Sequence, residues 1–401
     1  MQRRDFLRNT AILGSVMATP STILGGEKAI GKKRAFGLSL NHEILEKGKQ
    51  TRLWIPLPLI TEYQKVSDIK FDGNFNDPSV DYGEIPTLYA GYVGVAKPTL
   101  NIKFSVETFE RNTDFSKVKF NPNEKLDPEV AKFLEPSTQI QIDGVVKQKS
   151  DEIAGGIKGD LEKAHAIYTW MANTMQRDNS VLGCGLGDVK QILSSGKLSG
   201  KCTDINSVFV ALCRAQGIAA REMFGIRVGA SRFSTQRGAA PKDGVSHISG
   251  AQHCRAEFYL KGHGWIPVDP ADVTKVRLGE KLSNDDSKLA KIREYLFGNW
   301  EMCWIGFNYA REIVLNPRPA HVPIEIFSHP YCEVGGTPKD PYEKDHGKWC
   351  CVPECPLVLR IDRQLIERIL HSCSVVHRLQ RQKILWKLRR ASIGCRQSVP
   401  W

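Results

Sequence analysis

Apolar and polar residues follow different periods along the chain, and the changes of period predict its domains. Between about residues 35 and 114 apolar residues alternate with polar ones, most clearly over 100–106, and prolines and glycines interrupt the alternation. This pattern predicts a small β-rich N-terminal domain over about 35–120. A polar linker over about 121–136 separates it from the next domain.

The second region has the 3.6-residue period of helices. A helix is predicted over about 161–176, with Asp160 at its N-terminus, and a charged helical stretch over about 272–296. His165 falls on the apolar face of the first helix, where a packed core histidine is the ordinary role. Core packing is also expected for a cluster of aromatic residues that follows the second helical stretch: Trp300, Trp304, Phe307 and Tyr309.

One cysteine lies at the start of a strongly periodic helix. Apolar residues recur at intervals of three and four from Ile205 to Leu212, and Gly217 ends the pattern. Cys202 therefore falls in the first turn, where unpaired backbone N–H groups and the helix dipole favour a thiolate. Taken alone, a buried structural cysteine is the more common case. Asp204 could tune the thiol or stabilise the first turn, and we favour the second role.

A predicted β-hairpin carries two further polar groups of interest. The segment 252–260 alternates as a strand, glycines turn the chain, and 265–270 runs back as the second strand. His253 and Asp269 then both lie toward the end away from the turn, on neighbouring strands, although the sequence does not fix the register. A thiol, an imidazole and a carboxylate are the groups that nucleophilic acyl chemistry requires.

Three sequence blocks together resemble the transglutaminase-like superfamily, in particular exported bacterial proteins with this domain: GKCTDINSVFVALCRAQGIAAR, QHCRAEFYL and GWIPVDPAD. The resemblance implies an α+β fold with a papain-like/transglutaminase-like cysteine-protease core, here a catalytic domain over 125–345 preceded by the β-rich domain. It also implies that Cys202 is the nucleophile, His253 the general base and Asp269 the acid that orients the base.

A glycine-rich loop over 183–188 precedes the nucleophile block. A phosphate-binding loop would need a preceding strand and a closing lysine, so a wall of the substrate cleft is the better interpretation. Eleven cysteines are an odd number, so at least one thiol is unpaired or intermolecular in an oxidising compartment, a role that Cys202 would fill. Cys184 or Cys213 could form a disulfide, but the connectivity stays open.

The N-terminus has the pattern of a twin-arginine export signal over 1–30. Arg3 and Arg4 precede Phe6-Leu7 and an uncharged, weakly apolar segment, and cleavage is expected between residues 18 and 29. The alternative is a cytosolic terminus with a chance pair of arginines. We expect a periplasmic or secreted protein that is neither a lipoprotein nor inserted in a membrane, since no run of apolar residues approaches a spanning length.

The composition changes sharply in the tail over 347–401. This segment holds 11 Lys/Arg against 3 Asp/Glu, a net charge of +8 out of +12 for the whole chain. The basic isoelectric point is therefore no evidence that the body binds nucleic acid. The tail could form a basic amphipathic helix over 361–390 at a membrane or partner surface. It could also hold zinc through Cys350, Cys351, Cys355 and His371, with poor spacing, or result from a shifted reading frame, which we favour.

These features favour an enzyme that transfers acyl groups through a thiol and acts on a peptide or protein substrate. The acyl acceptor could be water, as in a peptidase or amidase, or an amine, as in a transglutaminase. The alternatives are a non-catalytic binding or scaffolding protein of the same fold and, less favoured, a peripheral membrane protein defined by its tail. No cofactor or metal is expected, since no acidic loop has calcium-site spacing. The oligomeric state stays open.

Overall fold

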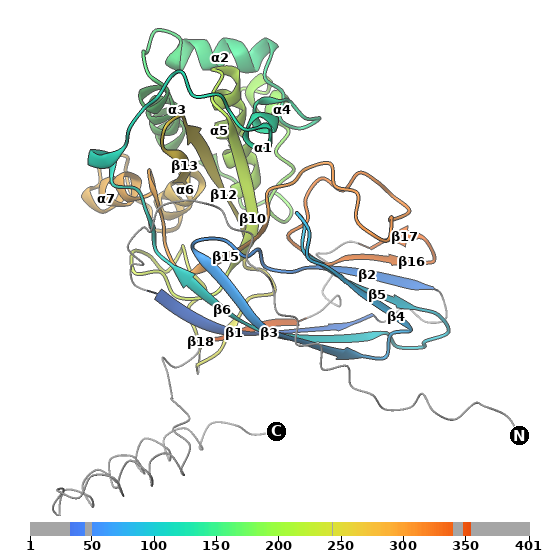
Figure 1. Cartoon of the computed structure of the whole chain (residues 1–401). Coiled ribbons are helices and arrows are strands. Elements are labelled where there is room, and N and C mark those ends of the chain that lie inside the picture. The colour runs from blue at the N-terminus through green and yellow to red at the C-terminus, as the bar shows by residue number, and fades with distance from the viewer. Residues whose placement is uncertain (1–32, 45–49, 243, 340–347, 354–401) are drawn as a thin grey trace, which may run out of the picture.

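The computed structural model describes residues 33–44, 50–242, 244–339 and 348–353. The chain has the predicted α+β composition: β-strands from the N-terminal third form one layered body, and a second body joins helices to a smaller sheet (Figure 1). The segment 1–30 and most of the tail lie outside the described residues. Within the described part, no helix has the length and apolar character needed to cross a membrane.

The N-terminal body is a sandwich of two five-stranded antiparallel sheets. The first contains, in spatial order, β11 (Ser246–His247), β18 (Lys348–Pro353), β1 (Lys33–Glu43), β6 (Thr99–Phe109) and β3 (Gln64–Gly73). The second contains β17 (Thr337–Pro338), β16 (Tyr331–Val334), β2 (Thr51–Pro56), β5 (Thr87–Tyr92) and β4 (Asp77–Asp81). Alternate residues of both sheets, such as Phe36, Leu38, Leu53 and Ile102, meet in one apolar core.

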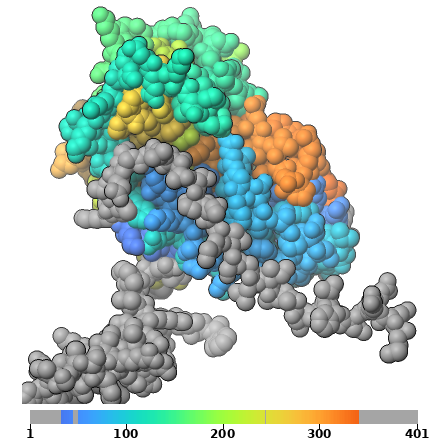
Figure 2. All heavy atoms as spheres, in the orientation of Figure 1, coloured from blue at the N-terminus to red at the C-terminus, as the bar shows by residue number. Residues whose placement is uncertain are grey.

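Strands from the C-terminal part of the chain complete both sheets of the sandwich. β16 pairs with β2, and β18 pairs with β1 over six residue pairs. Figure 2 shows the returning segment (orange) against the blue N-terminal strands. The residues 331–353, which the sequence analysis divided between the catalytic domain and the tail, thus contribute their strands to the N-terminal body.

The second body is built around a four-stranded antiparallel sheet and the helices that cover it. The sheet order is β13 (Gly264–Val268), β12 (Gln252–Leu260), β10 (Ala220–Arg227) and β15 (Trp304–Asn308). The principal helices are α2 (Gly144–Ala154), α3 (Asp160–Thr174), α4 (Val189–Ser194), α5 (Cys202–Ala215), α6 (Pro270–Gly279) and α7 (Ser287–Tyr295). Smaller elements are β7 (Arg111–Asn112), η1 (Phe115–Lys117), α1 (Pro128–Ala131), η2 (Lys132–Leu134), β8 (Gln176–Arg177), β9 (Ser199–Gly200) and β14 (Asn299–Trp300).

The central helix α5 is buried along nearly its whole length; it packs on β12 and β10 and also contacts α2, α3 and α6 (Figure 1). The predicted helix before it, α3, and the hairpin of β12 and β13 are confirmed. The prediction that His165 is a packed core histidine is wrong: the residue is exposed, and its ring makes a T-shaped contact with Phe297, with 4.8 Å between ring centroids. Helix α2 was not predicted, because its solvent face carries a run of polar residues between its few apolar ones.

A buried ion cluster joins the two bodies. Glu257 on β12 pairs with Arg111, which follows the last long strand of the sandwich, and with Arg221 on β10. Burial raises the pKa of Glu257, but the two arginines outweigh it and hold the pKa below its usual range.

The predicted cluster of aromatic residues is largely buried as well, with Trp300, Trp304 and Phe307 no more than 3% exposed.

Candidate active site

Cys202 is the first residue of α5, as the apolar period predicted. The carboxylate of Asp204 accepts hydrogen bonds from the backbone N–H of Lys201 at 2.9 Å and of Gly187 at 2.9 Å. Asp204 therefore stabilises the first turn, as expected, and also fixes the 183–188 loop against it. A Cβ on Gly200 would lie 2.3 Å from the Cβ of Asp204, so the residue before this turn has to be glycine.

A second polar network, one helical turn after the nucleophile, holds the 183–188 loop against α5. Ser207, one helical turn beyond Asp204, donates a hydrogen bond to Glu222 on β10. Arg311 donates to Ser207 at 2.9 Å, to Glu222 at 2.8 Å and to the backbone carbonyl of Leu186 at 2.9 Å. The N-terminus of α5 and the loop that faces it are thus fixed by charge-assisted hydrogen bonds.

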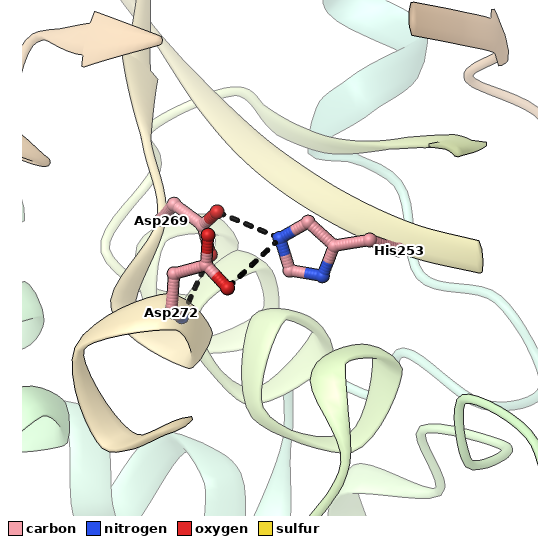
Figure 3. A group of neighbouring side chains, drawn as sticks. All are labelled: His253, Asp269 and Asp272. Carbon is pink, nitrogen blue, oxygen red and sulfur yellow. Dashed lines mark hydrogen bonds and ion pairs between the residues drawn. The ribbon is translucent and has the colours of Figure 1, made fainter. Parts of the chain in front are cut away.

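The hairpin places His253 and Asp269 in direct contact. Val268 pairs with Ala256, so Asp269, just past the end of β13, reaches the beginning of β12. Asp269 Oδ2 lies 2.8 Å from His253 Nε2, and its other oxygen accepts from the backbone N–H of Asp272 at 3.1 Å (Figure 3). Asp269 is therefore both the N-cap of α6 and the partner of the imidazole.

The second ring nitrogen of His253, Nδ1, is buried and makes no hydrogen bond of ordinary geometry in the described part of the chain. The backbone at His253 is fixed independently, because its carbonyl accepts from the indole N–H of Trp304 at 2.8 Å. An imidazole that holds a carboxylate with one nitrogen can take up a proton from a neighbouring group with the other.

That neighbouring group is the Cys202 thiol, which is only 4% exposed. Hydrogen bonds from the thiols of Cys184 and Cys254, followed by the hydrogen bond and charge of His253, hold the pKa of Cys202 well below its usual range despite burial. Conversely, the bond to Cys202 and burial raise the pKa of Cys184, and burial and Cys202 raise that of Cys254. The pKa is thus lowered at Cys202 and raised at Cys184 and Cys254, and Cys202 lies within reach of His253, which itself contacts Asp269.

The sequence analysis gave one partner of the Cys202 thiol, Cys184, another role and did not predict the other, Cys254. Cys184 was considered for a disulfide, but it is a free thiol in the structure, as are Cys202, Cys213, Cys254 and Cys303. The loop over 183–188 turns its cysteine toward the nucleophile. The signal that could have found Cys254 was its position next to His253 in the motif.

A second carboxylate near the imidazole was also missed. Asp272 Oδ1 lies 3.6 Å from His253 Nε2 (Figure 3), and its two oxygens bind Arg227 at 2.5 Å and Arg237 at 3.2 Å. Burial raises the pKa of Asp272, but Arg227, His253 and Arg237 outweigh it and keep the pKa well below its usual range. On the other side, Arg255 Nε lies 3.6 Å from Asp269 Oδ2.

The group His253, Asp269 and Asp272 has ligand atoms close enough together to suggest a metal site. The guanidinium groups of Arg227 and Arg237 already neutralise Asp272, and Arg255 stands beside Asp269. A divalent cation here would face these three charges at short range in a buried setting, where their repulsion is weakly screened. The donor set therefore fits an imidazole held for proton transfer better than a bound metal.

Comparison with known proteins identifies the family of the chain. Residues 147–270 match the family model of the transglutaminase-like superfamily. An uncharacterised protein of Haemophilus influenzae is 46% identical over 322 residues, which cover 76% of this chain and 87% of that protein.

Two solved structures are similar at low sequence identity. One, from Cytophaga hutchinsonii and described as a candidate cysteine protease, shares 17% identity with a TM-score of 0.48, over 80% of this chain and 98% of that one. The other, the periplasmic domain of TgpA from Pseudomonas aeruginosa bound to ethylmercury, shares 13% identity with a TM-score of 0.33, over 59% and 89%. With its family model matched across the nucleophile helix and the hairpin, the chain belongs to the transglutaminase-like superfamily.

Proposed function

We propose that the protein is an exported, thiol-dependent acyl-transfer enzyme that acts on peptide or carboxamide bonds through Cys202, His253 and Asp269. The observation that carries this proposal is the contact of Asp269 with His253 at 2.8 Å beside a cysteine whose pKa is well below its usual range. A non-catalytic scaffold has no need of a buried thiolate, which is costly to desolvate.

The first half of the reaction follows from the positions of these groups. The Cys202 thiolate attacks the substrate carbonyl carbon, and the carbonyl oxygen becomes an oxyanion. The backbone N–H of Cys202, at the first position of α5, has no intrahelical partner and is a donor suited to that oxyanion. His253, protonated by the thiol, gives its proton to the leaving amine, and the C–N bond breaks to leave an acyl-thioester on Cys202.

The second half returns the enzyme to its starting state. Neutral His253 accepts a proton from water or from an amine, which attacks the thioester carbonyl and displaces the Cys202 thiolate. Asp269 keeps the imidazole in the tautomer that points Nδ1 at the sulfur and stabilises its charged form. Water yields a peptidase or amidase, and an amine yields a transglutaminase.

The proposal includes the organisation of the chain. The segment 1–30 would direct export through its paired arginines, 35–120 would form the body of the sandwich, 125–345 would hold the site, and 347–401 would be the tail. The strand pairing of 331–353 with the sandwich supports a tight union of the two bodies.

Product analysis tests the reaction class. The purified protein is incubated with a mixture of glutamine-containing peptides, with and without a primary amine such as cadaverine, and the products are identified by mass spectrometry. We expect cleaved or deamidated peptides, or amine adducts, from the wild type and neither from Cys202→Ala. Product levels that are the same in both proteins would contradict the proposed function.

A further inference from the structure

An open hollow lies beside the segment that leads to Cys202. Its volume is about 760 Å³, and its lining includes Arg177, Asp178, Lys197, Ser199 and Leu278. The parallel strands β8 and β9 form one side, and Arg177 pairs with Gly200, two residues before Cys202. The hollow therefore extends along the segment that leads directly into the nucleophile.

Two cations on this side of the site have no acidic partner among the described residues. Arg177, half-buried in the wall of the hollow, donates from Nε to the Asn179 side chain at 2.9 Å and makes no ion pair. Lys275 is half-buried on α6, one helical turn before Leu278, which lines the hollow, and α6 packs on β8. By contrast, Lys197 in the same wall is exposed and paired with Asp178 at 3.2 Å.

These two cations lie close enough to influence each other and the nucleophile. Burial, and then the charges of Arg227 and Arg177, lower the pKa of Lys275 to about 8, while Asp272 and Cys202 act in the opposite direction. The groups that act on Lys275 thus lie on four elements: Arg227 on β10, Arg177 on β8, Cys202 on α5 and Asp272 on α6 itself. Arg227 forms an ion pair with Asp272, whereas Arg177 and Lys275 form none among the described residues.

We propose that Arg177 and Lys275 bind a carboxylate group of the substrate beside Cys202, so that the enzyme selects acidic peptides. This inference rests on the proposed function, because it names the substrate class of that same site. An arginine fork and a lysine ammonium are suited to a carboxylate, and the anion would relieve the repulsion between the two cations. Leu278, 46% exposed in the same wall, offers an apolar contact for the rest of the substrate.

A matched pair of alkylating reagents tests the charge preference at Cys202. Iodoacetate and iodoacetamide deliver nearly the same group to sulfur and release iodide, but only iodoacetate carries a carboxylate. The rate ratio at Cys202, iodoacetate over iodoacetamide, is measured at pH 7 by peptide mapping. We expect Arg177→Gln and Lys275→Gln each to lower this ratio about fivefold to tenfold, because each removes one weakly screened charge. Any change in thiolate content cancels in the ratio.

Lys197→Gln is the matched control, since it removes a cation of the same wall that Asp178 already neutralises. Its ratio should stay within about twofold of the wild type, as expected for an exposed pair screened by salt. Arg177→Lys should restore most of the preference. Equal ratios in Arg177→Gln, Lys275→Gln and Lys197→Gln would overturn the proposal.

A binding measurement separates this proposal from the proposed function. Acetyl-Ala-Glu-Ala-amide and acetyl-Ala-Gln-Ala-amide are titrated by calorimetry into Cys202→Ala, which carries no nucleophile. The glutamate peptide should bind at least about fivefold more tightly, and Arg177→Gln in the same background should abolish the difference. If the two peptides differ in affinity but Cys202 of the wild type proves unreactive, the acyl-transfer function alone is rejected. If the two peptides bind with equal affinity, the carboxylate site alone is rejected.

Discussion

His253→Ala is expected to lose nearly as much peptide- or amide-bond turnover as Cys202→Ser, about a thousandfold or more in kcat. The thiolate and the imidazole act as one unit, since His253 helps to hold the proton that Cys202 releases and returns it to the leaving amine. The double variant should therefore be little slower than either single variant. The measurement is kcat for the three proteins on a peptide substrate found by product analysis, with melting curves as a check on folding.

Asp269→Asn should reduce turnover less than His253→Ala does. Asparagine is a better replacement than alanine at this position. Asparagine can still accept the hydrogen bond from the backbone N–H of Asp272 and cap α6, so the fold should be kept while the negative charge beside His253 is lost. A purely structural role for the pair would appear as wild-type turnover with a lowered melting temperature. That outcome in either the His253 or the Asp269 variant would reject the triad.

Asp272→Asn is expected to destabilise the protein by about 3–5 kcal/mol, the cost typical of breaking a buried ion pair. Asp272 is fully buried, and its removal leaves Arg227 and Arg237 without their common carboxylate in the interior. The free energy of unfolding is measured by urea denaturation at pH 7. Asp285→Asn, at an exposed position in the loop before α7, should change it little.

The same variant should show how the contribution of Asp272 depends on pH. Because the folded-state pKa of Asp272 is well below the unfolded value of about 3.9, its contribution is present above pH 4 and is lost as pH falls through the folded value. The difference between wild type and Asp272→Asn should therefore be constant from neutral pH down to about pH 4. A difference that vanishes already at pH 6 would show that another group is responsible.

The sequence predicted the site wherever a local pattern determined the geometry. The apolar period of α5 placed Cys202 in the first turn, and the alternation of β12 with a glycine turn placed His253 and Asp269 on paired strands. Even the second role of Asp269 follows from a local signal, an aspartate directly before proline at the start of a helix.

What the sequence did not predict depends on contacts between distant segments. Cys184 has the signature of an ordinary loop cysteine, because its loop is held on α5 only by tertiary hydrogen bonds: Asp204 accepts one from the backbone of Gly187, and Arg311 donates one to the carbonyl of Leu186. Likewise, Arg237 in a long loop and Arg227 at the end of β10 meet Asp272 only through tertiary packing. The pairing of β16 and β18 with strands from the other end of the chain has no local signature at all.

The pH dependence of Cys202 alkylation tests the central claim most directly, because it needs no substrate. Iodoacetamide labelling of each cysteine is followed by peptide mapping in the wild type and in His253→Ala. Cys202 should be labelled at pH values below the range in which an ordinary thiol of pKa about 8.5 reacts, and ahead of Cys184 and Cys254. Its profile should move to higher pH in His253→Ala. An ordinary pKa at Cys202, equal labelling of the three thiols, or a profile unchanged by loss of His253 would contradict the account.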